Sequence, residues 1–272
     1  MTALGVWNGW VLARLALRSQ IRIVSALIRR EMVAHYGESR LGYLWAFLGP
    51  TLQLIGVVVI FDLVLHRHTP LGRSTALFVL TGFVSFFLYS KVALYVSGAV
   101  NGNRNLLILP PVKPYDVILA RVILEASTYL LVGFMMFFAL YFLGIAEAAP
   151  ADFLTIIEAC LLGIGFGLGV GMINIVLTGY FHNWMILFGL LSFPTWMLSG
   201  VWFLPEQLPE SFRNWMLYNP MMHVVMLFRM GFYPDYKGEF LDMPFLLAAV
   251  GITLALGMTL MKVCARRVLS PL

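Results

Sequence analysis

The sequence predicts an all-α protein that crosses a membrane several times. Of its 272 residues, 61% are hydrophobic and only 11% are charged, and the mean hydropathy is +0.88. A soluble domain carries about a quarter charged residues. Several apolar runs reach roughly 20 residues, the length that a helix needs to cross the hydrocarbon core of a bilayer. These observations exclude a soluble globular domain and predict one polytopic transmembrane domain over residues 1–272.

The first predicted element, residues 7–30, is an amphipathic helix that lies along the membrane surface. Its arginines fall in one narrow sector of a helical wheel, and aliphatic residues fill the opposite side. The two sets are Arg14, Arg18, Arg22 and Arg29 against Leu12, Leu17, Val24 and Leu27. The alternative is a soluble helix packed on a partner.

Six membrane spans follow this helix. They are predicted at residues 43–65, 75–97, 121–145, 153–179, 184–201 and 244–263. With the N-terminus inside, the cytoplasmic segments hold twelve Lys and Arg residues and the outer segments hold five, which satisfies the positive-inside rule. Both termini are therefore predicted to be cytoplasmic. In the fourth span, Gly163, Gly167 and Gly171 share one face, which predicts close packing against another helix.

The segment 202–235 is predicted to form a re-entrant hairpin on the outer side. Four prolines divide it into two helical pieces, each too short to span. Backbone of this kind is tolerated at membrane depth only where protein or a water-filled cavity covers it. The candidate residues of this hairpin are Arg213, Trp215, Tyr218, His223 and Arg229.

The residue pattern argues against several kinds of catalytic site. None of the four lysines is followed by Ser or Thr, so the chain cannot form a P-loop. His66 and His68 lack a third ligand nearby, so no metal site is predicted. Glu147, Asp152 and Glu158 could suggest a glycosyl-transfer pair, but nothing fixes their separation. No cofactor is expected on this chain.

Charged residues inside predicted spans are a further lead, because such charges are unfavourable unless they face a cavity or a partner. Arg121 and Glu125 lie one helical turn apart and are expected to pair. Lys91 is expected to extend to the inner surface, too far from Asp62 to pair with it. Structural and functional roles for these four residues stay open.

The connection at residues 101–116 is the most informative loop. Its four consecutive aliphatic residues, Leu106 to Leu109, have no reason to be exposed to solvent. A short helix that docks into a groove of another protein explains them, and packing against the chain's own spans is the alternative.

Three segments carry a resemblance to a known family: REMVAHYGESRLGYLWAFLGP (30–50), VKPYDVILARVILE (112–125) and YNPMMHVVMLFRMGFYPDY (218–236). They resemble, in this order, the motif between the interface helix and the first span, the loop into the third span and the outer hairpin of ABC type 2 permeases that export polysaccharide. The resemblance is strongest to the Kps-type permeases of Gram-negative capsule exporters. The resemblance covers nearly the whole chain in order.

The resemblance implies a homodimer in the inner membrane that binds two copies of a separate cytoplasmic ATPase, which holds ATP and Mg²⁺. It also implies a periplasmic co-polymerase-type adaptor, an outer-membrane export protein and a lipid-linked, anionic polysaccharide as cargo. No nucleic acid is expected. The implied ATPase-coupling residues are Asn103, Arg104, Leu106, Leu107, Leu109, Pro110, Val112, Lys113 and Pro114.

A basic and aromatic set is predicted to form the substrate pathway. Arginines would attract the acidic glycolipid head, and rings would stack on sugars: Arg29, Arg30, Arg40, Tyr43, Trp45, Tyr89, Trp184 and Trp196. The alternatives are positive-inside anchoring for the arginines and an interfacial belt for the rings.

Two other functions remain open. One is export of another lipid-linked glycan, such as O-antigen or teichoic acid. The other is a membrane-embedded glycan-modifying enzyme, which would need polar catalytic residues converging at one membrane face.

Overall fold

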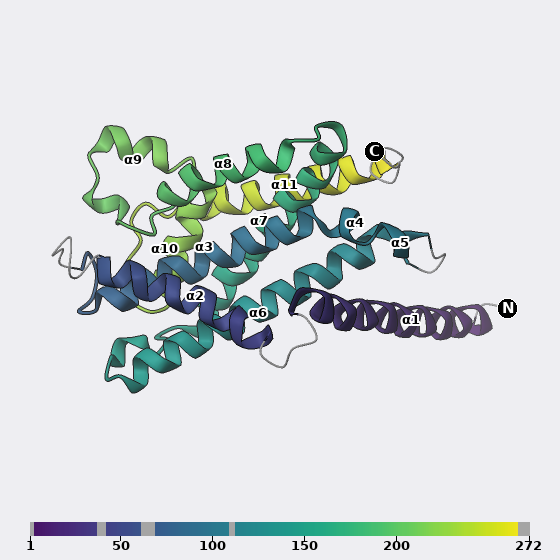
Figure 1. The fold of residues 1–272 in the computed structure, drawn as a ribbon, viewed down its shortest axis with the longest axis horizontal. Coiled ribbons are helices and arrows are strands. Elements are labelled where there is room, and N and C mark those ends of the chain that lie inside the picture. The colour runs from purple at the N-terminus through teal and green to yellow at the C-terminus, as the bar shows by residue number, and fades with distance from the viewer. Residues whose placement is uncertain (1–2, 37–41, 61–68, 109–111, 266–272) are drawn as a thin grey trace.

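The computed structural model describes residues 3–36, 42–60, 69–108 and 112–265, and these residues form helices without any β-strand (Figure 1). This confirms the all-α class. The longer helices are α1 (Ala3–Tyr36), α2 (Gly42–Val59), α3 (Thr75–Ser97), α6 (Pro114–Phe142), α7 (Phe153–Tyr180), α8 (Trp184–Met197) and α11 (Met243–Val263). The short ones are α4 (Ala99–Gly102), α5 (Arg104–Leu107), η2 (Ala146–Ala148), η3 (Pro205–Gln207), α9 (Glu210–Met216) and α10 (Pro220–Met230).

Four helices in the described part of the chain are long and apolar enough to cross a membrane: α3, α6, α7 and α11. The chain is therefore a polytopic membrane protein. Helix α8 is apolar but only 14 residues long. Helix α2 occupies most of the predicted first span, and residues 61–65 of that span, with Asp62, lie outside the described residues.

Side-chain caps explain where several helices begin. Each capping oxygen accepts a backbone N–H of the first turn, which would otherwise lack a partner. The caps are Ser74 for α3, Asp152 for α7, Asn219 for α10 and Asp242 for α11.

Two predicted boundaries need correction. Helix α6 begins at Pro114 rather than at residue 121, so the end of the predicted loop 101–116 is its first turn. Proline is well tolerated there because the first N–H groups of a helix have no acceptor within the helix. Helix α1 extends over Ala3–Tyr36, beyond the predicted range 7–30.

Helix α3 forms the centre of the bundle and packs against both α6 and α7, while α11 packs against α7. Residues Leu77–Leu80 of α3 are completely buried. A Cβ atom at Gly167 would lie 2.7 Å from the Tyr89 carbonyl oxygen, and one at Gly171 would lie 2.6 Å from Val96 Cβ. The predicted close packing is therefore confirmed for Gly167 and Gly171, with α3 as the partner, whereas a Cβ atom at Gly163 would lie 3.4 Å from Val224 of α10.

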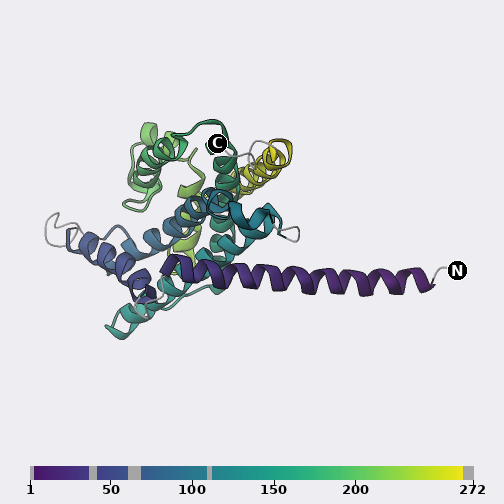
Figure 2. The same ribbon diagram turned by 45° about the vertical axis from the view of Figure 1, so that its right-hand side comes forward.

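The two ends of the bundle carry different elements. The N-terminus, α4, α5 and the C-terminal end of α11 lie at one end, which we call the loop end, and α9 and η2 lie at the opposite end (Figure 1). Helix α1 runs obliquely to the bundle and projects beyond it (Figure 2). Val24 and Leu27 of α1 are buried, whereas Arg14, Arg18, Arg22 and Arg29 are exposed, as the amphipathic pattern predicts.

The predicted outer hairpin consists of η3, α9 and α10. Helices α9 and α10 have seven and 11 residues, which confirms that neither piece can span a bilayer. Helix α10 packs against α3 and α7, and its residues Met221–Arg229 are buried. Helix α10 is therefore packed into the bundle.

Arg229 fixes α10 in place without a carboxylate partner in hydrogen-bonding range among the described residues. Its guanidinium is completely buried and donates to the carbonyl oxygens of Gly200 at 2.7 Å and Val201 at 2.9 Å. It also lies 4.0 Å from the centre of the Phe78 ring, which adds a cation–π contact. One side chain thus ties α10 to α3 and to the segment after α8.

We predict that Arg229→Met destabilises the protein by about 3 kcal/mol, because it leaves several buried carbonyl groups without donors. Arg229→Lys should be intermediate, since one ammonium keeps the charge but has fewer donors in a different geometry. The apparent Tm of purified protein in detergent checks both. Arg22→Met, at an exposed site on α1, is the control and should leave the Tm unchanged. An unchanged Tm in Arg229→Met would contradict the anchoring role.

Candidate functional site

The connection between α3 and α6 is held from inside and exposed at its tip. Helices α4 and α5 are single turns on either side of Asn103, and Ala99 and Val100 of α4 are buried. Leu106 and Leu107 are half-buried against the core, whereas Ile108 is 80% exposed. Ile108, which we call the tip of the connection, therefore exposes an aliphatic side chain next to residues that are packed against the bundle.

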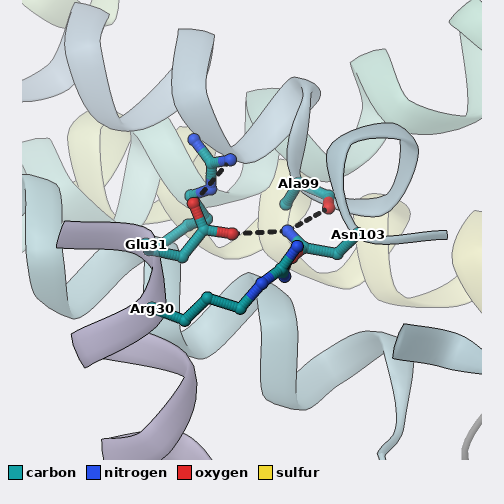
Figure 3. A network of polar contacts seen from close by, with 5 residues as sticks. Arg30, Glu31, Ala99 and Asn103 are labelled. Atoms are coloured by element: carbon teal, nitrogen blue, oxygen red, sulfur yellow. Dashed lines mark hydrogen bonds and ion pairs between the residues drawn. The ribbon is translucent and has the colours of Figure 1, made fainter. Parts of the chain in front are cut away.

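Asn103 is the centre of a polar network under this connection (Figure 3). The side chain is 1% exposed, and its amide nitrogen donates to Glu31 Oε1 at 2.6 Å and to the Ala99 carbonyl oxygen at 3.0 Å. Its amide oxygen accepts a hydrogen bond from the Arg30 guanidinium. The nitrogen and the oxygen of the buried amide therefore both have hydrogen-bond partners, which lie on α1 and at Ala99 of α4.

Glu31 also forms a buried ion pair with Arg121 of α6, with 2.7 Å between Oε2 and Nη2. Arg121 was expected to pair with Glu125, and this expectation was wrong. Glu125 Oε1 is buried and has no hydrogen-bond partner among the described residues. The helical spacing that makes an Arg121–Glu125 pair possible carries no information about α1, which brings a competing carboxylate to the guanidinium.

A second side-chain contact between α1 and α6 involves Gln20 and Asp116. The Gln20 side-chain amide donates to Asp116 Oδ1, and Asp116 Oδ2 accepts the Lys113 backbone N–H at 2.9 Å. Asp116 is 2% exposed, so its carboxylate is satisfied within the protein. Helix α1 thus fixes the connection at Asn103 and again at the start of α6.

Glu31, Gln20 and Asp116 were not among the predicted site residues. Glu31 lies one and two helical turns from Leu27 and Val24, on the apolar face of α1. A charged residue on an apolar face is a signal that it meets a buried partner. The sequence offered that signal at Glu31, but gave no indication for Gln20.

The remaining predicted coupling residues have modest contacts. Arg104 donates to Asn101 Oδ1 at 3.1 Å, Val112 packs against the core, and Pro114 opens α6. Leu109 and Pro110 lie outside the described residues.

The predicted pathway residues whose side chains the structure describes lie on α1, α3 and α8. Arg29 is exposed beside Arg30, and Arg40 lies outside the described residues, as do the side chains of Tyr43 and Trp45 on α2. Tyr89 is buried and stacks on Phe166, with 5.1 Å between ring centres. On α8, Trp184 donates to Asn174 Oδ1 at 2.9 Å, and Trp196 packs edge-to-face on Trp202 at 4.8 Å.

The predicted hairpin residues divide into an exposed and a buried group. Trp215 and Tyr218 are 80% and 75% exposed, and Arg213 lies over the Phe240 ring at 4.2 Å. His223 is buried, and its Nδ1 accepts the Asp242 backbone N–H at 3.1 Å. The Nε2 atom then carries the proton and donates to the Leu217 carbonyl oxygen at 2.8 Å.

Two further observations concern charge and metal binding. The Lys91 ammonium lies over the Phe87 and Tyr129 rings, at 5.4 and 5.8 Å from their centres.

Among the described residues, no three His, Cys, Asp or Glu side chains gather in a group that could hold a metal ion.

The Glu31–Arg121 pair leads to a stability prediction. Glu31→Gln or Arg121→Gln alone should lower stability by about 3 kcal/mol, because each leaves one buried charge unpaired. The double variant should lose less than the sum of the two, since no unpaired charge remains. Thermal unfolding of the four proteins of this cycle checks the coupling, with Arg29→Gln as an exposed control. Strict additivity would argue against a direct pair.

Comparison of the sequence with known proteins identifies the family of this chain. The sequence profile of the ABC-2 type transporter family matches residues 22–233. The chain is 31% identical over 251 residues to the polysialic acid transport protein KpsM of Escherichia coli, which covers 92% of this chain and 96% of KpsM. It is 29% identical over 220 residues to the capsule polysaccharide export inner-membrane protein CtrC of Neisseria meningitidis, covering 81% of this chain and 82% of CtrC.

Similarity to an O-antigen permease is more limited. The O-antigen export system permease protein RfbA of Myxococcus xanthus is 31% identical over 85 residues, which cover 31% of this chain and 32% of RfbA. The profile match and the KpsM similarity, by contrast, extend over most of the chain, and the profile match includes the C-terminal part of α1 and the α4–α5 connection. The chain belongs to the ABC-2 type transporter family.

Proposed function

We propose that this chain is the membrane-spanning permease subunit of an ATP-driven exporter of capsular polysaccharide in the inner membrane of a Gram-negative bacterium. The carrying observation is the similarity to KpsM along nearly the full length of both chains. The proposed cargo is a lipid-linked, anionic polymer. In this proposal the chain crosses the membrane six times, with both termini and the loop end in the cytoplasm.

A separate ATPase would supply the energy, with ATP and Mg²⁺ bound on that partner and none on this chain. The supporting feature is the tip of the α4–α5 connection, where Ile108 is 80% exposed. An exposed aliphatic side chain on a rigid base suits insertion into a groove of a partner protein. The buried network around Asn103 would carry displacement of this tip into α1 and α6.

We further propose a homodimer with two ATPase copies and with the export pathway between the protomers. Within the described residues α8 has no buried position, and its Ile186, Leu190 and Phe193 are 67%, 67% and 62% exposed. The predicted pathway residues Trp184 and Trp196 lie on this same helix. A helix this thinly packed can face a second copy. A periplasmic adaptor and an outer-membrane export protein would continue the route.

Export of O-antigen is the second candidate, favoured by the partial match to RfbA. A carbohydrate-binding domain on the partner ATPase would support O-antigen, and an ATPase without one would support capsule. Because the chain belongs to a transporter family, we do not propose a glycan-modifying enzyme.

The docking role of the connection is tested with Ile108→Asp. The side chain is exposed, so this change should leave folding intact while a buried carboxylate disfavours the docked complex. Affinity purification of the permease with its co-expressed ATPase should recover at least about tenfold less ATPase, a loss of about 1.4 kcal/mol in binding. Val263→Asp, at a 75% exposed site on the same end, is the matched control. Full ATPase recovery with Ile108→Asp would contradict the docking role.

Substitutions of Arg29 and Arg30 on α1 distinguish a role in attracting the cargo from a role in stabilising the protein. Arg29→Gln should reduce surface polysaccharide several-fold with an unchanged Tm, because Arg29 is exposed and would contact the acidic cargo. Arg30→Gln should also lower the Tm, because it removes a hydrogen bond to buried Asn103. Surface polysaccharide is measured at matched permease levels, with Arg14→Gln as the exposed control. Normal export in Arg29→Gln would refute the charge argument for this residue.

A further inference from the structure

An apolar cavity of about 450 Å³ lies between α6, α7 and α10, at the end of the bundle opposite α4 and α5. This volume is within the range of small-molecule sites in proteins. Half of its lining residues are aromatic, among them Phe134, Phe137, Phe138, Phe142, Phe228 and Phe232.

The cavity is held open by packing that fixes its floor and walls. A Cβ atom at Gly133 would lie 2.8 Å from Val84 Cγ1, so α6 and α3 are in tight contact at the floor. Phe137 stacks on Phe232 with 4.3 Å between ring centres, which locks one wall against the segment after α10. Ala148 and Ala149 also line the cavity, and their small side chains leave space unfilled.

One side of the cavity opens to the surroundings of the helices. Phe134, Phe138 and Phe142 are 65%, 55% and 72% exposed and lie on α6, which with α7 is long and apolar enough to span a membrane. The medium around these helices is the acyl chains of lipids. With so few polar atoms in its lining, the cavity offers water and sugars few hydrogen-bond partners. Its chemistry fits a hydrocarbon chain.

Carboxylates stand close to the Ala148–Ala149 side of the cavity. Glu147 accepts the Arg73 backbone N–H at 3.2 Å. Asp152 is exposed, and hydrogen bonds from the Thr155 hydroxyl and from backbone N–H groups lower its pKa, so it is ionised at neutral pH. The carboxylates of Glu147 and Asp152 favour an amine-bearing head group over an anionic one.

We propose that this cavity binds one acyl chain of phosphatidylethanolamine from the membrane leaflet at this end, with the lipid amine near Glu147 and Asp152. The proposal rests on the membrane location of the helices and stands apart from the exported cargo. A bound chain would fill the gap between the α6–α7 hairpin and α10.

The test is native mass spectrometry of the purified permease from vesicles with equal amounts of phosphatidylethanolamine and phosphatidylglycerol. We expect wild type to retain phosphatidylethanolamine and Ala149→Phe, which fills the cavity, to retain at least several-fold less. Ala139→Phe, at an exposed site on α6 outside the cavity, is the matched control and should behave as wild type. Leu130→Trp fills the cavity from α6 and provides a second variant if Ala149→Phe does not fold.

Asp152→Asn tests the head group, because asparagine keeps the helix cap while removing the charge. It should shift retention away from phosphatidylethanolamine. The proposal is overturned if wild type retains no lipid, or if the filled and control variants retain equal amounts. Preference for phosphatidylglycerol in wild type would overturn the amine site. Loss of the dimer in Ala149→Phe with unchanged lipid retention would show that a second copy occupies the cavity.

Discussion

The buried ion pair between Glu31 and Arg121 is the constraint from which the arrangement of the loop end follows. Each charge would be strongly unfavourable alone in this environment, so α1 and α6 must meet at one register. Once Glu31 is fixed, its second carboxylate oxygen accepts the Asn103 amide at 2.6 Å. Three segments that are distant in sequence are thereby joined through one carboxylate.

The opposite end satisfies a buried charge by different means. Arg229 donates to main-chain carbonyl oxygens of the segment after α8 and lies over the Phe78 ring, so it needs no acid. Between the two ends, the helices are held together by the close approach of their backbones. Gly167 and Gly171 bring α7 against α3, and a side chain at either position would displace one of these helices. The two ends are thus fixed by polar contacts and the middle by van der Waals packing.

Local patterns in the sequence were sufficient to predict the approximate positions of the longer helices, because apolar length and glycine spacing depend on few neighbours. The all-α class, the packing face of α7 and the exposed arginine face of α1 all followed from such patterns. Contacts between residues that are distant in sequence could not be predicted from such patterns. Arg121 had a plausible partner one turn away in Glu125, and although Glu31 lies on the apolar face of α1, nothing local indicated that Arg121 is its partner. In the loop, Ile108 was part of the aliphatic run, but only the fold shows that it is more exposed than Leu106 and Leu107.

The same helical turn of α1 carries both a loop contact and a proposed cargo contact. Arg30 and Glu31 hold Asn103, while the neighbouring Arg29 is exposed. On the proposed function, a partner that moves the α4–α5 tip would therefore pull on the turn that presents Arg29. Because the contacts around Asn103 are direct and buried, little of that displacement would be absorbed by side-chain rearrangement. Docking of the energy source and capture of an acidic cargo would then be linked mechanically at one helical turn, without requiring a signal through the whole bundle.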